Sequence, residues 1–172
     1  EFCFGDGECV ACPCGNDEAS GVRAGCRNDA LGRGARLSVQ GWPSLTSHGL
    51  RFDLRRAAPS SFAALLSAPN RLPASPSGPC LPGSGIQAVA LDGLRCIGGG
   101  LTRHGVRPVD VNGAVGLDTP AWEGTPGMPF GALEGFVPGQ VRHFQVFYRI
   151  DPTSGCGTGQ GTTQGVSQVF AP

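Results

Sequence analysis

Eight cysteines constrain what this chain can fold into more than any other feature of its sequence. Five of them fall within the first 26 residues, and the full set is Cys3, Cys9, Cys12, Cys14, Cys26, Cys80, Cys96 and Cys156. An even, clustered set in a chain rich in glycine and proline is typical of a disulfide framework made in an oxidising compartment. We therefore predict that all eight form disulfides. Their connectivity stays open, because eight cysteines allow about 105 pairings.

The spacing of Cys9 and Cys12 also occurs in redox motifs and in zinc half-sites. A redox motif of this spacing opens a helix after a strand, but Pro13, Cys14 and Gly15 follow here and prevent a helix. A zinc ribbon needs a second close pair of cysteines, and the later cysteines are widely spaced. The pattern favours structural disulfides over a redox or metal site.

The start of the chain and its short apolar runs bear on its location. The sequence begins at Glu1 without a Met or a basic-then-apolar leader, which in a disulfide protein predicts a mature product whose signal peptide has been removed. No apolar run approaches the roughly 18 residues of a membrane-spanning helix. The absence of lysine beside abundant Arg, Ala, Gly and Pro indicates a GC-rich genome. We expect a secreted or cell-surface bacterial protein without a membrane span.

Charge and composition exclude several classes of protein. The 13 basic residues, all arginine, are balanced by 13 Asp and Glu residues, so the formal net charge at pH 7 is +0. This balance argues against a nucleic-acid-binding domain, and the lack of net repulsion permits copies of the chain to associate. The 29 Gly and 15 Pro residues exclude a coiled coil and favour a loop-rich, strand-rich chain.

Alternating apolar and polar residues predict half-buried strands. The clearest cases are residues 36–40, 50–55 and 141–150. In the last of these, Phe144 and Val146 share one face, while His143 and Gln145 lie on the other, which we expect to be exposed. Weaker patterns predict strands over 62–67, 86–91, 93–97, 101–106, 109–115 and 165–170. Residues 61–67 also fit a two-turn helix capped by a serine.

Seven to nine short strands separated by Gly/Pro turns predict an all-β fold. We expect a single antiparallel β-sandwich of jelly-roll-like form over residues 31–172, preceded by the disulfide-stapled, irregular segment 1–30. Two long loops, 68–85 and 117–139, interrupt the strands. We see no domain boundary within residues 1–172.

Several motifs resemble a family of secreted, Cys-rich domains from planctomycetes, myxobacteria and similar environmental bacteria. The motifs are Cys3-Phe4-Gly5-Asp6-Gly7, Cys12-Pro13-Cys14-Gly15-Asn16, Gly25-Cys26-Arg27-Asn28, Asp92-Gly93-Leu94-Arg95-Cys96, Phe144-Gln145-Val146-Phe147-Tyr148-Arg149 and Phe170-Ala171-Pro172. This essentially uncharacterised family implies a secreted β domain and brings no catalytic residues. Cys9 and Cys80 depart from its pattern. If the other six cysteines form three family bridges, these two would most simply pair with each other, and a bond between subunits is the alternative.

Acidic residues beside the N-terminal glycines suggest one candidate metal ligand. Asp6 lies between Gly5 and Gly7 and is the best candidate for a calcium ligand, but no calcium loop of the EF-hand type is present. Asp beside Gly more often forms a turn through side-chain-to-backbone bonds. We predict turn formation here and no cofactor.

Candidate catalytic residues are isolated in the sequence. His48, His104 and His143 are far apart, no serine occupies a Gly-x-Ser-x-Gly elbow, and no carboxylate pair has glycosidase spacing. We predict no catalytic residues and no enzyme activity. We expect His143 to be a solvated surface residue.

Two sets of residues are candidates for binding carbohydrate. Trp42, Trp122 and Tyr148 are candidates for an aromatic platform that stacks on sugars, although core packing explains these residues equally well. Acidic polysaccharide can be attracted by Arg51, Arg55, Arg56, Arg103 and Arg107. The balanced total charge favours a solvated strand face for these arginines.

These observations lead to an expected function and two alternatives. We expect a non-catalytic extracellular structural protein that self-associates into a surface layer, matrix or filament. The contacts would use exposed strand edges or a donated terminal segment, residues 1–10 or 165–170. The first alternative is a secreted carbohydrate-binding or adhesion module. The second is a secreted hydrolase, which clustering of His, Asp and Ser in one cleft would favour.

Overall fold

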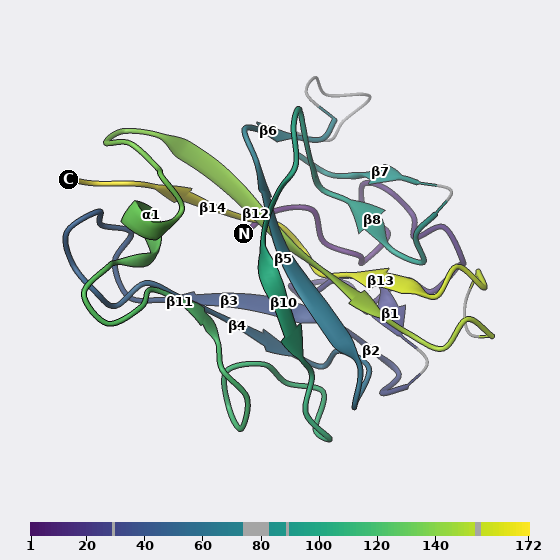
Figure 1. Cartoon of the computed structure of the whole chain (residues 1–172). Coiled ribbons are helices and arrows are strands. Elements are labelled where there is room, and N and C mark those ends of the chain that lie inside the picture. Colours follow the sequence, from purple (N-terminus) through teal and green to yellow (C-terminus); the bar gives the residue numbers. More distant parts are fainter. Residues whose placement is uncertain (29, 74–82, 89, 154–155) are drawn as a thin grey trace.

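The chain forms a mostly β structure of antiparallel strands with one short helix (Figure 1). The computed structural model describes residues 1–28, 30–73, 83–88, 90–153 and 156–172. The elements in these ranges are β1 (Arg27–Asn28), β2 (Arg33–Gly34), β3 (Arg36–Gln40), β4 (Arg51–Arg55), β5 (Phe62–Ala68), β6 (Asn70–Arg71), β7 (Ile86–Gln87), β8 (Leu94–Arg95), β9 (Ile97–Gly98), β10 (Thr102–Pro108), β11 (Trp122–Glu123), α1 (Phe130–Leu133), β12 (Val141–Arg149), β13 (Gln160–Thr162) and β14 (Val166–Val169).

The described strands form five sheets and not a single sandwich. Two larger sheets have the strand orders β10-β5-β12-β13, with β14 also paired to β12, and β11-β4-β3. The other three sheets have two strands each. The prediction of an antiparallel, mostly β chain is therefore confirmed. The chain has more strands than the seven to nine expected, because seven of the described strands have only two residues.

The main core lies between the two larger sheets. In Figure 1, β3 and β4 cross behind β5, β10 and β12. The inward-facing, fully buried side chains include Leu37, Phe52, Leu54, Leu65, Trp122, Phe144 and Val146. Burying side chains of this size contributes about 1.5–3 kcal/mol each to folding. The alternating patterns of β3, β4 and β12 thus predicted the correct inward faces.

Residues 61–67 form a strand, and the helical alternative is wrong. Strand β5 spans Phe62–Ala68 and pairs with β12 on one side and β10 on the other. Its residues alternate between the main core, as at Ala63 and Leu65, and the opposite face of the sheet. Two strand partners supply the backbone hydrogen bonds that a helix would make internally.

The opposite face of the five-stranded sheet is covered in part by the N-terminal segment. Phe2, Cys3, Cys96 and Ile97 form a second apolar cluster there, with Ala68 of β5. As a result, residues of β12 that were predicted to face solvent are buried: Gln145 has 0% exposure and His143 has 9%. The alternation predicts which residues share a face, but it does not show that a second layer covers the outer face.

Three disulfides hold this covering segment in place. Cys3 bonds to Cys96, Cys12 to Cys26, and Cys14 to Cys156. They confirm the predicted use of the N-terminal cysteines as structural bridges in an oxidising environment. Cys80 lies outside the described residues, so the Cys9–Cys80 bridge stays a prediction.

The weaker strand predictions are only partly confirmed. Residues 109–115 form a turn, because the Asp110 carboxylate accepts hydrogen bonds from the N–H groups of Asn112 and Ala114. In place of the strands predicted over 86–91 and 93–97, the structure has the short strands β7, β8 and β9. The predicted loop 117–139 contains β11 and α1.

Both ends of the chain are paired within the structure. Phe2 and Gly165 exchange two backbone hydrogen bonds of 2.9 Å each, and β14 pairs with β12. The terminal segments proposed as donors to a neighbour would have to leave these partners first. No helix among the described residues is long and apolar enough to cross a membrane.

Candidate functional site

Asp6 and Asp17 of the N-terminal segment accept hydrogen bonds from nearby backbone N–H groups. Asp6 Oδ1 accepts a hydrogen bond from the Glu8 N–H at 3.2 Å, and Asp17 Oδ1 accepts one from the Cys12 N–H at 2.7 Å. These are the local side-chain-to-backbone bonds that the sequence favoured at this place. The only potential metal-ligand group found among the described residues excludes Asp6.

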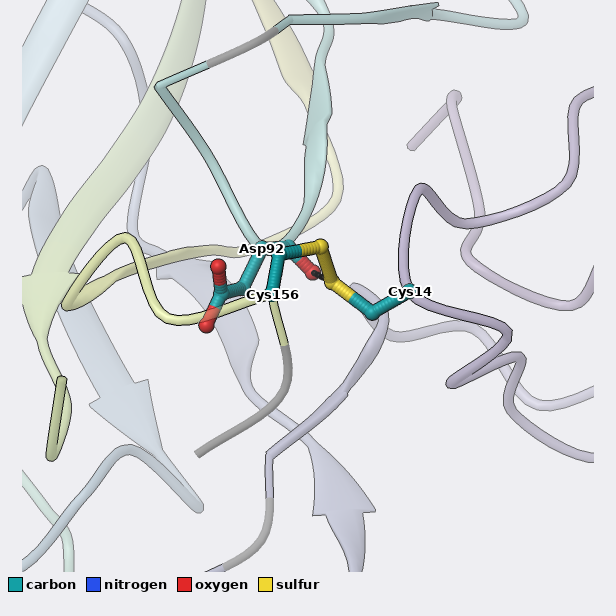
Figure 2. A group of neighbouring side chains, drawn as sticks. All are labelled: Cys14, Asp92 and Cys156. Carbon is teal, nitrogen blue, oxygen red and sulfur yellow. Dashed lines mark hydrogen bonds between the residues drawn. A yellow bond between two sulfur atoms is a disulfide. The ribbon is translucent and has the colours of Figure 1, made fainter. Parts of the chain in front are cut away.

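That group consists of Cys14, Asp92 and Cys156 (Figure 2). Its two sulfur atoms are bonded to each other, so they are not available as thiolate ligands. The Asp92 carboxylate accepts hydrogen bonds from the Thr158 hydroxyl at 2.6 Å and the Thr158 N–H at 3.3 Å. Asp92 therefore anchors the segment that carries Cys156, and the group is not a metal centre.

The structure brings together a serine, a histidine and a glutamate that are distant in sequence. His104 Nε2 lies 2.7 Å from Ser67 Oγ, and His104 Nδ1 lies 2.6 Å from Glu134 Oε2. This is the order of contacts in a Ser–His–acid hydrolase triad. Sequence reasoning missed it, because the three residues come from β5, β10 and the end of α1.

The burial of this triad argues against catalysis. Ser67 has 0% exposure and lies within β5, paired to strands on both sides, rather than at an exposed turn. The His104 ring packs against Phe130, Phe136 and Phe144, with centroids 5.6–5.7 Å away. A substrate carbonyl has no path to Ser67 Oγ through this packing.

Burial also sets the charge state of the two inner histidines. It lowers the pKa of His104, although the hydrogen bond to Glu134 opposes this shift. Burial likewise lowers the pKa of His143, with the charges of Arg71 and Arg142 adding to the effect. His143 Nδ1 lies 2.8 Å from Ser167 Oγ, so the prediction of a solvated surface histidine is wrong.

The three predicted aromatic residues do not form a sugar-binding platform. Trp122 and Tyr148 are core residues with 0% and 3% exposure, whereas Trp42 has 71%. The Trp122 indole N–H donates to the Gly105 carbonyl at 3.1 Å. Burial raises the pKa of Tyr148, whose hydroxyl lies 3.3 Å from Asn28 Nδ2. These contacts explain both residues by packing.

One groove lies where the N-terminal segment leaves the five-stranded sheet uncovered. We call it the open sheet face, and it is lined by Phe62, Ala63, Ala64, Leu66, Arg103, Val106, Phe147, Tyr148, Arg149 and Gln160. Its volume is about 240 Å³. Phe62 and Val106 have 61% and 46% exposure. Apolar side chains thus occupy its floor, and Arg103 and Arg149 supply positive charge.

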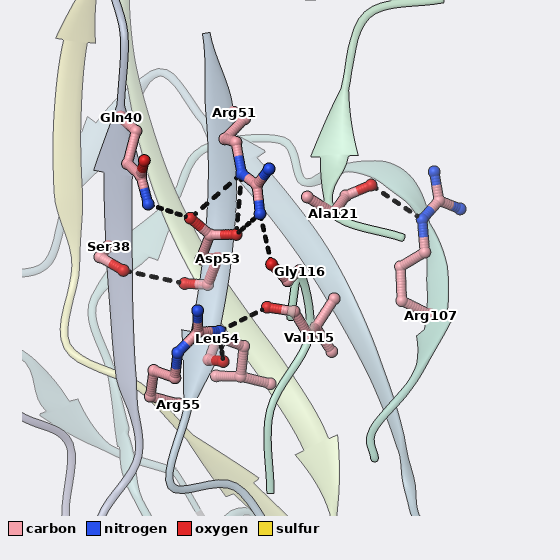
Figure 3. A network of polar contacts seen from close by, with 10 residues as sticks. All are labelled: Ser38, Gln40, Arg51, Asp53, Leu54, Arg55, Arg107, Val115, Gly116 and Ala121. Atoms are coloured by element: carbon pink, nitrogen blue, oxygen red, sulfur yellow. Dashed lines mark hydrogen bonds and ion pairs between the residues drawn. The ribbon is translucent and has the colours of Figure 1, made fainter. Parts of the chain in front are cut away.

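A second groove lies on the outer side of the three-stranded sheet. We call it the arginine groove, and it is lined by Arg36, Ser38, Arg55, Arg56 and Asn112, with a volume of about 480 Å³. Of the arginines predicted to act together, Arg55 and Arg56 meet here. Arg51 instead pairs with Asp53 (Figure 3), a bond that raises the pKa of Arg51.

The arginines of β10 also separate. Arg107 donates through Nε to the Ala121 carbonyl at 3.2 Å (Figure 3), whereas Arg103 lines the open sheet face. Register and side-chain hydrogen bonding, which the sequence does not display, decide which arginines meet.

Comparison of the chain with protein-family models, curated proteins and solved structures finds no match. The resemblance to secreted Cys-rich domains therefore stays a prediction.

Proposed function

We propose that this chain is a non-catalytic extracellular structural subunit that self-associates through the open sheet face. The observation that carries the proposal is the incomplete second layer on the five-stranded sheet. The N-terminal cluster covers Ala68 at one end of β5, while Phe62 at the other end is 61% exposed. Covering this apolar surface with a second copy would extend the buried layer and remove apolar area from water.

The charges select which part of a second copy fits. An isologous contact, in which the same surface meets itself, would bring Arg103 and Arg149 close to their own counterparts, and like charges disfavour such a contact. Residues 108–141 carry the opposite charge to Arg103 and Arg149, because they include four carboxylates and no basic residue. Within that segment Leu117 is 63% exposed and adjoins the exposed Asp118.

A contact between two different surfaces has consequences for the assembly. Heterologous contacts of this kind form rings if the rotation closes and filaments if it does not. The formal net charge of +0 leaves little long-range repulsion between copies. Three disulfides stabilise the folded state of each subunit. These properties support a surface layer, matrix or filament as the product.

This contact differs from the donation of a terminal segment. Residues near both termini already pair within their own chain. The edge of β10 is also tied to the neighbouring 121–123 segment by the side chains of Trp122 and Arg107. A contact through the sheet face leaves all of these bonds intact. Assembly by this contact therefore requires no rearrangement of the subunit.

Light scattering on the unreduced protein tests the proposal. We expect particles of many subunits for the wild type, and at least a tenfold higher concentration threshold for assembly in Phe62→Ser. Trp42→Ser is the matched control, because it removes an exposed aromatic ring outside the open sheet face. A wild-type mass of 17.6 kDa across the concentration range would overturn the proposal. Equal effects of the two variants would overturn the assigned surface.

A further inference from the structure

The arginine groove is built on an unfavourable pairing of like charges. Residues of β3 and β4 alternate, so that Arg36 and Ser38 share the outer face with Asp53 and Arg55. In the strand register Arg36 lies directly opposite Arg55. Like charges directly opposite each other in an antiparallel pair destabilise the sheet. The pairing therefore calls for a compensating interaction.

The backbone conformation of Arg56, the residue after Arg55, is a second unfavourable feature of the groove. Its φ is 62°, in the left-handed region that favours glycine and that residues with long side chains rarely adopt. The Asn28 side-chain amide donates to the Arg56 carbonyl at 2.8 Å and holds this conformation. Violations of local rules that gather at one spot are characteristic of functional sites.

Nearby carboxylates neutralise the groove only in part, through the ion pair of Glu1 with Arg36. The Asp53 carboxylate is fully buried and is engaged by Arg51 at 2.7 Å and by Gln40 at 2.6 Å (Figure 3). Glu1 forms a 3.1 Å ion pair with Arg36, which leaves the Arg36 side chain 46% exposed. Among the described residues, no carboxylate lines the groove.

The guanidinium group of Arg55 is held in place by neutral acceptors. Its Nη1 donates to the backbone carbonyls of Leu54 and Val115, each at 2.9 Å (Figure 3). These bonds fix the position of the group but do not cancel its charge. Asn28, which contacts the Arg56 carbonyl, belongs to the β1–β2 pair.

We propose that the arginine groove binds an acidic polysaccharide through its carboxylate or sulfate groups. Planar guanidinium groups match such oxyanions in bidentate geometry. The Ser38 hydroxyl and the Asn112 amide are placed to hydrogen-bond the sugar hydroxyls between the anionic groups. The volume of about 480 Å³ falls within the range of small-ligand sites. An anionic ligand would also relieve the repulsion between Arg36 and Arg55.

Calorimetric titration of the full disulfide-bonded chain tests this site. The probes are dextran sulfate, polygalacturonate and neutral dextran, each at low and high NaCl concentration. We expect binding of at least one anionic polymer, weakening with salt, and none of neutral dextran. The double variant Arg36→Gln/Arg56→Gln should lower the affinity at least tenfold. Arg55 is left unchanged, because its backbone hydrogen bonds support the fold.

The matched control is Arg103→Gln/Arg149→Gln, which removes the same charge from the open sheet face. Its affinity should stay within about twofold of the wild type, because site contacts rather than net charge govern binding. A second test variant, Asn112→Asp, places a carboxylate at the groove and should also weaken binding. It does not alter any arginine, so it tests the site even if the double variant fails to fold.

The outcomes separate this site from the proposed self-association. Failure of both anionic polymers to bind the wild type, or equal losses in the two double variants, would overturn the arginine groove as a binding site. Preference for dextran sulfate or for polygalacturonate identifies sulfate or carboxylate as the recognised group. The threshold for assembly, measured without polymer on the two double variants, should change only in the variant of the open sheet face.

Discussion

Gln145 joins the five-stranded sheet to residues 94–96, which the Cys3–Cys96 disulfide ties to the N-terminal segment. Replacing Gln145 with leucine should destabilise the protein. Its Oε1 accepts a hydrogen bond from the Cys96 N–H at 3.0 Å. Its Nε2 donates to the carbonyls of Leu94 and Thr163 at 2.8 and 2.7 Å. The side chain has 0% exposure, so water cannot replace these bonds without rearrangement.

The magnitude follows from which groups lose all their partners in Gln145→Leu. The Leu94 carbonyl keeps a second bond, from the Thr162 hydroxyl at 2.9 Å. The Cys96 N–H and the Thr163 carbonyl keep none that the structure describes. Each orphaned buried group costs about 1–3 kcal/mol, and the added apolar burial of leucine returns about 1 kcal/mol. We expect the free energy of unfolding to fall by about 1–5 kcal/mol.

Urea unfolding of the oxidised protein measures this loss. With an m-value of about 2 kcal/mol per molar urea, the midpoint should fall by about 0.5–2.5 M. Gln140→Leu is the control, because Gln140 bonds the Val137 N–H at an exposed site, where the change should stay within about 0.5 kcal/mol. A loss below about 1 kcal/mol for Gln145→Leu would refute the reasoning, because the network would then contribute nothing that water cannot supply.

Two further predictions concern a turn and the response to acid. Gly116→Ala should destabilise by about 2–4 kcal/mol in urea unfolding, because φ is +87° and a Cβ would collide with the buried Asp53 carboxylate. Burial lowers the pKa values of His104 and His143 below 6.5, so the unfolded state takes up protons first. Stability should therefore be constant above about pH 6.5 and fall below it, by at most about 1.4 kcal/mol per pH unit for each histidine. Equal urea midpoints at pH 7.5 and pH 5 would contradict this.

The sequence predicted the strands with long alternating patterns, because such patterns reflect burial of one face. Strands β3, β4 and β12 appear where residues 36–40, 50–55 and 141–150 predicted them. Of the two-residue strands, β7, β8 and β9 were predicted only as parts of longer strands. The others, β1, β2, β6 and β11, were not predicted, because two residues are too few to show an alternating pattern. Their pairing depends on turns and disulfides that bring distant segments together, as Cys3 and Cys96 do across 93 residues.

The polar residues inside the fold were the hardest to predict. Alternation assigned Gln145 to the outer face correctly, but it could not show that another segment covers that face. The same limit hid the Ser67–His104–Glu134 arrangement, since each residue alone looks like an ordinary strand or loop residue. Once both faces of a sheet are covered, a polar residue on either face must find partners within the protein.

The arginine groove shows how register turns scattered charges into a site. The sequence placed Arg51 with Arg55 and Arg56 because they are neighbours on one strand. The structure pairs Arg51 with the carboxylate of Asp53 and sets Arg36 opposite Arg55. Glu1 pairs with Arg36, one of these two arginines. Among the described residues, no carboxylate lines the groove itself, so Arg36, Arg55 and Arg56 leave a positive surface there. Binding of an anion, as we propose, would compensate that charge.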